Sequence, residues 1–266
     1  GQRQDWARSS QRSFATGVNA RTNDSANTGR AGLVYLADNG LAPYVSASQS
    51  FAPTLGASRD NTPFKPTKGT QYELGVRYEP ADGNMMLSGA VYDLTQRNAL
   101  TVDPTNTTYS VQTGKARSRG LELEARANVG AASFTATYAY TDARTTRSND
   151  PLLQDQRIAL VPLHSASLWG DYDFTKLGAD GLTLGLGARY ASSTNIPGYT
   201  EDAPGYVMID GMARYDFGAV SQSLKGLSLT VNARNLFNRG YVSCSAASGC
   251  RYSAPRLLFA TMSYRW

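Results

Sequence analysis

The sequence predicts an all-β fold, an antiparallel transmembrane β-barrel of which this chain supplies about eleven strands. Three observations lead to this prediction. Apolar and polar residues alternate with a period of two through most of the chain, as in strands with one face in lipid. Short turns and long polar loops alternate between these segments. No run of about 18 apolar residues occurs, which excludes a helical membrane span.

The alternation is clearest near the C-terminus. In residues 227–234 every second residue is apolar, and the residues between them are polar or charged. Residues 258–266 repeat the pattern and end on Trp266, and aromatic residues are preferred at membrane interfaces. No later segment packs against this last strand, so we expect it to help close a barrel.

Most of the other predicted strands have about the 9–11 residues that a tilted strand needs to cross a bilayer. In chain order, the predicted strands are residues 28–36, 41–51, 69–79, 85–97, 115–128, 133–143, 163–174, 182–192, 206–217, 227–234 and 258–266. Residues 1–6 are predicted to be the outer end of one further strand. The chain is therefore expected to be the C-terminal part of a longer protein.

The long connections all fall at one end of the predicted sheet. They are residues 7–27, 52–68, 98–114, 145–162 and 194–205, followed by the segment that holds both cysteines. The short turns are residues 37–40, 80–83, 129–131, 175–181 and 218–225, and the Asp-Asn-Gly sequence in the first of these is typical of a tight hairpin. Outer-membrane barrels have short periplasmic turns and long external loops, so the C-terminus is predicted to be periplasmic.

One face of each strand is predicted to line a polar lumen. The alternation is least clear in residues 85–97, where the preferred register turns Ala90, Tyr92 and Leu94 outward and Val91, Asp93 and Thr95 inward. The charged residues predicted to face the lumen are Glu73, Arg77, Glu79, Asp93, Arg97, Glu122, Glu124, Arg126, Asp171, Asp173, Arg189, Asp210, Arg214, Asp216, Arg234 and Arg265.

Charge and cysteine content narrow the possible partners and compartment. The net charge is +5, but the charges are scattered singly along the strands, so no nucleic-acid partner is predicted. Cys244 and Cys250 lie in a Gly/Ser-rich loop, which favours a local disulfide in an oxidising compartment. Two free thiols in a reducing compartment are the alternative.

Catalysis finds no support in the residue pattern. No serine lies in a G-x-S-x-G motif, and two cysteines with the single His164 make no zinc site of the usual kind. We therefore predict no catalytic residues, no metal site and no cofactor held by side chains. His164 is expected to be a rim residue. The strand aromatics are predicted to form interface girdles, whereas the loop residues Tyr199, Tyr241 and Tyr252 are better placed to contact a ligand.

Several motifs together resemble those of TonB-dependent siderophore receptors, and most closely the ferrichrome, or ferric hydroxamate, receptors. They are Tyr72-Glu-Leu-Gly-Val-Arg-Tyr78 with the preceding Pro66–Gln71, Gly89-Ala-Val-Tyr-Asp-Leu-Thr95, Ser118-Arg-Gly-Leu-Glu-Leu-Glu-Ala125, Tyr138-Ala-Tyr-Thr-Asp142, Asn235-Leu-Phe-Asn-Arg-Gly-Tyr241 and the Cys-x5-Cys loop before an aromatic C-terminus.

The resemblance implies a 22-stranded barrel filled by an N-terminal plug, in the outer membrane of a Gram-negative bacterium. Residues 1–266 would be the C-terminal part of that barrel, without the plug. It also implies uptake of a ferric siderophore with energy from the TonB complex, so that iron enters only as substrate. The further expected partners are outer-membrane lipid, lipopolysaccharide and the barrel assembly machinery, which would recognise Trp266.

The resemblance also indicates candidate ligand-contacting residues in the last loop. Ferrichrome receptors carry a ligand-contacting aromatic residue after the first cysteine of this loop, where this chain has Ser245. The candidates are Tyr241, Ser245, Arg251 and Tyr252. Three alternative functions stay open at this stage: a passive porin-type channel, a TonB-dependent receptor for another ligand, and a soluble β-sandwich binding module.

Overall fold

The computed structural model describes residues 2–12, 19–196, 199–245 and 249–266. Its strands are β1 (Gln2–Arg12), β2 (Asn19–Val34), β3 (Leu41–Ala52), β4 (Thr67–Tyr78), β5 (Met85–Val102), β6 (Ser110–Val129), β7 (Ala132–Arg147), β8 (His164–Asp173), β9 (Leu182–Ala191), β10 (Tyr206–Asp216), β11 (Leu227–Arg234), β12 (Val242–Ser245), β13 (Gly249–Tyr252) and β14 (Leu257–Tyr264). Three short 3-10 helices are η1 (Phe174–Leu177), η2 (Phe217–Ala219) and η3 (Gln222–Leu224).

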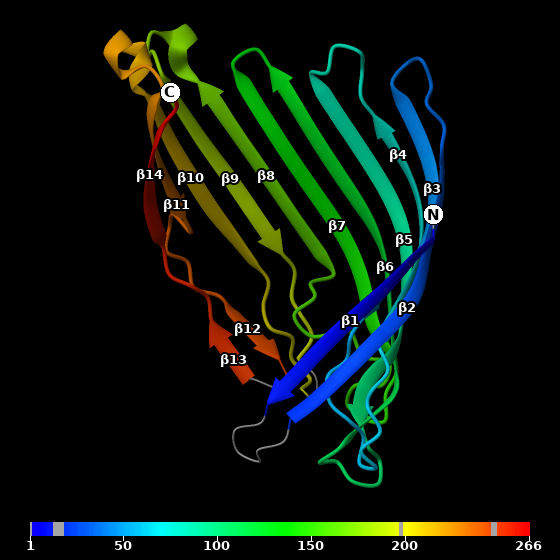
Figure 1. Ribbon diagram of the computed structural model, residues 1–266. Helices are drawn as coiled ribbons and strands as arrows, with labels where there is room; N and C mark the ends of the chain where they lie inside the picture. Colours follow the sequence, from blue (N-terminus) through cyan, green and yellow to red (C-terminus); the bar gives the residue numbers. More distant parts are fainter. Residues whose placement is uncertain (1, 13–18, 197–198, 246–248) are drawn as a thin grey trace.

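The strands form one curved antiparallel sheet in chain order. Twelve strands pair from β1 through β11 to β14, while β12 and β13 form a separate hairpin. Figure 1 shows the tilted strands, with the tight turns and 3-10 helices at the upper end and the long connections at the lower end. The C-terminus lies at the upper end, as predicted. Neither β1 nor β14 has a partner on its outer edge among the described residues, so the sheet is not closed.

The short turns between strands depend on local backbone geometry. In the turn between β2 and β3, Gly40 has a φ of +86°, and the Leu41 amide donates to Asn39 Oδ1 at 3.2 Å. Between β10 and β11, Gly226 has a φ of +86°, and a Cβ there would lie 2.0 Å from the carbonyl oxygen of Arg265. These positions therefore require glycine, because a side chain would be strained and would collide with the neighbouring strand.

The cross-strand register confirms the predicted alternation on most strands. Val45, Leu74 and Val91 are direct neighbours on one face, as are Leu168, Ala188 and Ile209 further along the sheet. These apolar side chains are exposed or half-exposed, and none of the largest described side chains is fully buried. A membrane barrel explains this pattern, because hydrocarbon covers the exterior face and the other face lines the lumen.

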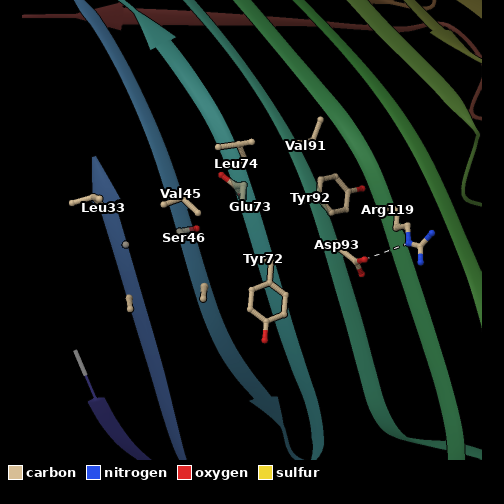
Figure 2. Close-up of a pocket in the computed structure, with 13 residues that line it drawn as sticks. Leu33, Val45, Ser46, Tyr72, Glu73, Leu74, Val91, Tyr92, Asp93 and Arg119 are labelled. Carbon is tan, nitrogen blue, oxygen red and sulfur yellow. Dashed lines mark ion pairs between the residues drawn. The ribbon is translucent and has the colours of Figure 1, made fainter. Parts of the chain in front are cut away.

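The predicted register of β5 is wrong. Leu74 pairs with Val91 and Glu73 with Tyr92, so Val91, Asp93, Thr95 and Arg97 face the exterior, while Ala90, Tyr92 and Leu94 face the lumen. Two kinds of partner favour this register. The Tyr92 hydroxyl lies 3.4 Å from Ser118 Oγ on the lumen side, and two exterior arginines contact Asp93. Asp93 and Arg97 therefore lie on the exterior face and do not line the lumen as predicted. Figure 2 shows the Asp93–Arg119 ion pair on this face.

The prediction of a loop at residues 7–27 is also wrong. β1 continues to Arg12 and β2 begins at Asn19, and the two strands pair over their whole facing length. Similarly, β5 extends to Val102, β6 begins at Ser110 and β7 extends to Arg147. Backbone pairing continues beyond the apolar band because the ladder satisfies N–H and C=O groups whatever the side chains are. The predicted outer strand at residues 1–6 is present from Gln2 onward, and Gly1 lies outside the described residues.

Candidate ligand-binding site in the last external loop

The Asn-Leu-Phe-Asn motif forms the turn that ends β11. Asn235 has a φ of +53° and is 3% exposed. Its Nδ2 donates to the Arg239 carbonyl at 2.9 Å, and its Oδ1 accepts from the Arg239 amide at 2.8 Å. Asn238 also has a φ of +53°, and its Oδ1 accepts from the Arg256 amide at 2.8 Å. Because asparagine tolerates this left-handed conformation, the motif acts as a structural turn that holds both sides of the last loop.

An ion pair on the lumen side is joined to this turn. Arg189 on β9 donates to both carboxylate oxygens of Asp210 on β10, with Nη2 3.0 Å from Oδ1. Asp210 Oδ1 also accepts from the backbone amide of Asn235 at 2.8 Å. The side chain of Arg189 is 49% exposed, so part of its guanidinium remains available toward the lumen. A guanidinium carries five N–H donors and suits an oxygen-rich ligand.

Two tyrosines stack beside this ion pair. The rings of Tyr206, the first residue of β10, and Tyr241 lie 3.8 Å apart between centroids, with an interplanar angle of 17°. Tyr206 has the same strand parity as Asp210, so both belong to the lumen face. The result is a cluster of phenol and guanidinium groups at the outer end of the lumen.

The cysteine hairpin follows Tyr241. Cys244 and Cys250 form a disulfide, as predicted, and are direct cross-strand neighbours in the pair β12–β13. Arg251 is opposite Ser243, so the positions of Tyr241, Ser245 and Arg251 share one face of the hairpin. Tyr252 is opposite Val242 on the other face and is 87% exposed. The side chain of Ser245 lies outside what the structure describes.

Thus the structure brings only part of the predicted ligand set together. Tyr241 joins Tyr206 and the Arg189–Asp210 pair, whereas Tyr252 points away from that face. The roles of Tyr241, Ser245, Arg251 and Tyr252 in binding stay predictions. Sequence reasoning did not single out Tyr206 as a ligand candidate, or join it to Arg189. The period-two pattern assigns both to the lumen, but no spacing indicates that Tyr206 meets a residue of the last loop.

A second lumen cluster surrounds the Tyr-Glu-x-Gly motif. The Tyr44 hydroxyl donates to Glu73 Oε1 at 2.6 Å, and Gln71 Nε2 donates to Glu73 Oε2 at 2.9 Å. A Cβ at Gly75 would lie 2.5 Å from the Tyr44 ring, so the glycine makes room for that ring. Neither Glu73 nor Glu122, which also faces the lumen, has an ion pair within the described part of the chain. This wall of the lumen therefore carries two carboxylates that have no cationic partner among the described residues.

Neither metal-binding nor catalytic geometry appears in the described segments. No group of three or more metal-ligating His, Cys, Asp or Glu side chains occurs among them. His164 faces the exterior at the outer end of β8, where its Nδ1 lies 2.9 Å from the Tyr138 hydroxyl. It is thus an interfacial residue that contacts Tyr138 and Tyr140. Over the same segments, no helix has the length and apolar character needed to cross a membrane.

The tilted meander, the exterior apolar band and the lumen charges define an outer-membrane barrel domain. Residues 1–236 match the family described as TonB dependent receptor-like, beta-barrel, and the chain belongs to this family. The ferrichrome outer membrane transporter/phage receptor of Escherichia coli (strain K12) is 40% identical over all of this chain and 36% of its own length. The ferrioxamine B receptor of Salmonella typhimurium (strain LT2) is 38% identical over 88% of this chain and 33% of its own.

Solved structures share the fold. The siderophore receptor PiuA from Acinetobacter baumannii superposes with a TM-score of 0.74 at 23% identity, covering 96% of this chain and 38% of that one. The unliganded ferric citrate transporter FecA gives a TM-score of 0.72 at 23% identity, covering 99% and 42%. The predicted family, β-barrel fold and outer-membrane location are therefore confirmed. The chain spans about a third of the length of the curated relatives it matches.

Proposed function

We propose that this chain is the C-terminal barrel portion of an outer-membrane receptor that binds a ferric siderophore externally and imports it with energy from TonB. A ferrichrome-like hydroxamate is the ligand class we favour. The observation that carries the proposal is the cluster of Tyr206, Tyr241 and Arg189 at the outer end of the lumen. Support comes from relatives named for ferrichrome and ferrioxamine B.

The cluster is suited to binding and not to bond-breaking chemistry. Stacked phenol rings offer flat apolar area with a hydroxyl at the edge, and Arg189 offers further N–H donors to the oxygens that surround a chelated iron. Asp210 orients Arg189 and is itself held by the Asn235 amide. The iron is substrate, held by the siderophore. We propose that the protein is not an enzyme and holds no cofactor.

The lumen acids offer a docking surface for a plug domain supplied by the rest of the protein. Glu73 and Glu122 face inward without a cationic partner in the described residues. A plug domain in the lumen would cover these carboxylates, and covered carboxylates need partners, so we expect basic plug residues against them. The plug domain would then make the contact with TonB. Trp266, exposed after β14 on the short-turn side, is our proposed recognition residue for the assembly machinery.

The test is uptake of radioactive iron as ferric hydroxamate by cells that lack their own hydroxamate receptors and produce the intact protein carrying this chain. We expect saturable uptake that disappears in a strain without TonB. Uptake that persists without TonB would identify a passive channel. TonB-dependent uptake of another ferric chelate, with none of any hydroxamate, would keep the receptor class and overturn the ligand assignment.

A further inference from the structure

On the lumen face of β8 and β9, the indole of Trp169 lies flat on two glycines. Trp169 pairs with Gly187, and the next lumen position of β9 toward the short turns is Gly185. A Cβ at Gly187 would collide with Cε3 of the indole, and a Cβ at Gly185 would lie 2.6 Å from its Cζ2. Neither glycine has a positive φ. The space for the indole therefore requires glycine here, and the backbone conformation does not.

One face of this indole is covered by the backbone of β9, so the opposite face is turned toward the lumen. Thr135 on β7 flanks Trp169 on one side. Met212 on β10 flanks it on the other, with Cε 3.3 Å from the position of a Cβ at Gly185. Trp169 is half-buried. The face of an indole carries the most negative potential among aromatic side chains and attracts cations. The arrangement thus offers a fixed cation-binding platform to the lumen.

A carboxylate lies beside the indole. Trp169 Nε1 donates to Oδ1 of Asp171, the next lumen residue of β8, at 3.2 Å. Within the described residues this carboxylate accepts no second hydrogen bond and forms no ion pair. Asp173, the following lumen residue, accepts from the Thr175 amide at 2.9 Å and likewise has no described cationic partner. Two carboxylates therefore adjoin the platform on its inner side.

The cations of the same lumen wall do not balance these carboxylates. Arg189 is bonded to Asp210, and Arg126 is paired with Glu124. Arg214 is separated from Asp173 by β9, because Thr183 pairs with both of them. Two strand spacings amount to about 10 Å, which is too far for an ion pair. The negative charge beside the indole is thus open to a cation that this wall does not supply.

A second lumen aromatic shows by contrast what is left free at Trp169. Tyr44 lies over Gly75 in the same way, but its hydroxyl donates to Glu73 Oε1 at 2.6 Å. Gln71 donates to the other oxygen of Glu73 at 2.9 Å, so both carboxylate oxygens are bonded within the wall. At Asp171 only Oδ1 is used. Its Oδ2 stays available to an N–H donor that lies on the indole.

We propose that Trp169 and Asp171 form a binding site for an organic cation, a guanidinium or alkylammonium group that lies on the free indole face and pairs with the carboxylate. An anion would be repelled by Asp171 and Asp173, and a neutral apolar group would cover Asp171 without giving it a partner. The cation can belong to a molecule that diffuses into the lumen or to a basic side chain of the intact protein. The inference requires only the barrel lumen and is independent of the siderophore.

The experiment uses the intact protein carrying this chain, labelled with 5-fluorotryptophan and followed by fluorine NMR in detergent. The resonance of Trp169 is the one that Trp169→Phe removes. The probes are ethylguanidinium and ethylurea, its neutral planar analogue. The test variant Asp171→Asn keeps an oxygen for the indole N–H and removes only the charge. The control Asp38→Asn makes the same change at the exposed short turn between β2 and β3.

We expect ethylguanidinium to shift the Trp169 resonance of the wild type and the control saturably, with a dissociation constant on the order of 10 mM. Ethylurea should give no saturable shift, and Asp171→Asn should weaken ethylguanidinium binding at least about fivefold. This result identifies a site open to a diffusing cation.

A basic side chain of the intact protein in the site gives a different result that also supports the proposal. Added ethylguanidinium then causes no shift, but Asp171→Asn lowers the temperature at which the heat-modifiable gel band is lost, and Asp171→Glu restores it. An equal response to ethylurea, unchanged ethylguanidinium affinity in Asp171→Asn, or the absence of both effects would each overturn the proposal. Asp171→Ser gives the same decision if Asp171→Asn does not fold.

Discussion

Two adjacent groups of four strands, β4 to β7 and β8 to β11, differ most at the outer end of their exterior face. On β4 to β7 this face carries charged rows, whereas on β8 to β11 it ends in aromatic and small apolar side chains. The lumen faces of the two groups also differ in how their charges are paired. Arg189 on β9 and Asp210 on β10 form an ion pair, whereas Glu73 on β4 and Glu122 on β6 have no described cationic partner. We expect unpaired charges to be candidates for the surfaces where other molecules bind, because a charge that such a molecule covers is costly unless it gains a partner.

The largest effect should come from placing a charge in the exterior apolar band, between the outer end and the short turns. Leu186 lies in the middle of the exterior apolar band on β9, and Leu186→Arg should destabilise the barrel by about 2–4 kcal/mol, because the guanidinium would enter hydrocarbon. The matched variant Tyr190→Arg, at the outer end of the same strand, should cost at most about 1 kcal/mol. Folding titrations into lipid vesicles measure both. Equal losses would mean that the outer end of β9 is not at the interface.

The next effect concerns the turn after β11. Asn235→Ala should destabilise the last loop by about 2–3 kcal/mol, because it removes the two hydrogen bonds that the buried Asn235 side chain makes to the Arg239 backbone and puts alanine at a positive φ. Asn232→Ala, on the lumen face of the same strand, is the control. Proteolysis of the loop in the folded receptor should accelerate only for the first variant.

Reduction of the disulfide should loosen the cysteine hairpin and leave the sheet intact. The disulfide closes a short loop, with a sequence separation of 6, so the entropic model assigns it about 2 kcal/mol. Hydrogen exchange should increase at β12 and β13 after reduction, while β9 to β11 keep their protection. Increased exchange throughout β9 to β11 would show that the hairpin supports the sheet.

Two tyrosines in the same loop provide a test of the ligand site. Tyr241→Ala removes the ring stacked on Tyr206 and should weaken siderophore binding about three- to tenfold, in line with about 1 kcal/mol for an aromatic pair. Tyr252→Ala, on the opposite face of the hairpin, should change affinity less than about twofold. Quenching of intrinsic fluorescence by the ferric siderophore measures both dissociation constants. The reverse ranking would move the site to the other hairpin face.

The smallest effect is a local dependence on pH in the loop after β5. The hydroxyl of Thr105 at 2.7 Å, followed by its amide at 2.8 Å, donates to Asp103 Oδ1 and holds the pKa of that carboxyl below its ordinary value. The stabilisation is therefore present above the ordinary pKa and is lost as the pH falls through the lowered one. The protection factor of the Thr105 amide, its exchange rate relative to the intrinsic rate at each pH, should be constant from about pH 5 to 8 and should fall in stronger acid. Thr105→Ala should shift this loss of protection to higher pH.

Where sequence reasoning failed, the failures have identifiable causes. In β5, residues 88–92 alternate weakly because Ser88, Gly89 and Ala90 are all small, and the two larger residues, Val91 and Tyr92, lie on opposite faces. The partners of Asp93 that accompany the observed register, Arg117 and Arg119, belong to the neighbouring strand. The hairpin of β1 and β2 was missed because its outer residues are polar on both faces, so no period-two pattern remains.

Periodicity and loop length by themselves determined that the chain is an antiparallel membrane sheet with its loops at one end, because a strand between lipid and water must alternate. The motifs determined the family. Only the tertiary structure decided that Asp93 lies on the exterior face, that Tyr206 stacks on Tyr241, and that four cations, one on each of β4 to β7, share one exterior row. These depend on the register between neighbouring strands, and a shift of one residue exchanges the faces of a whole strand.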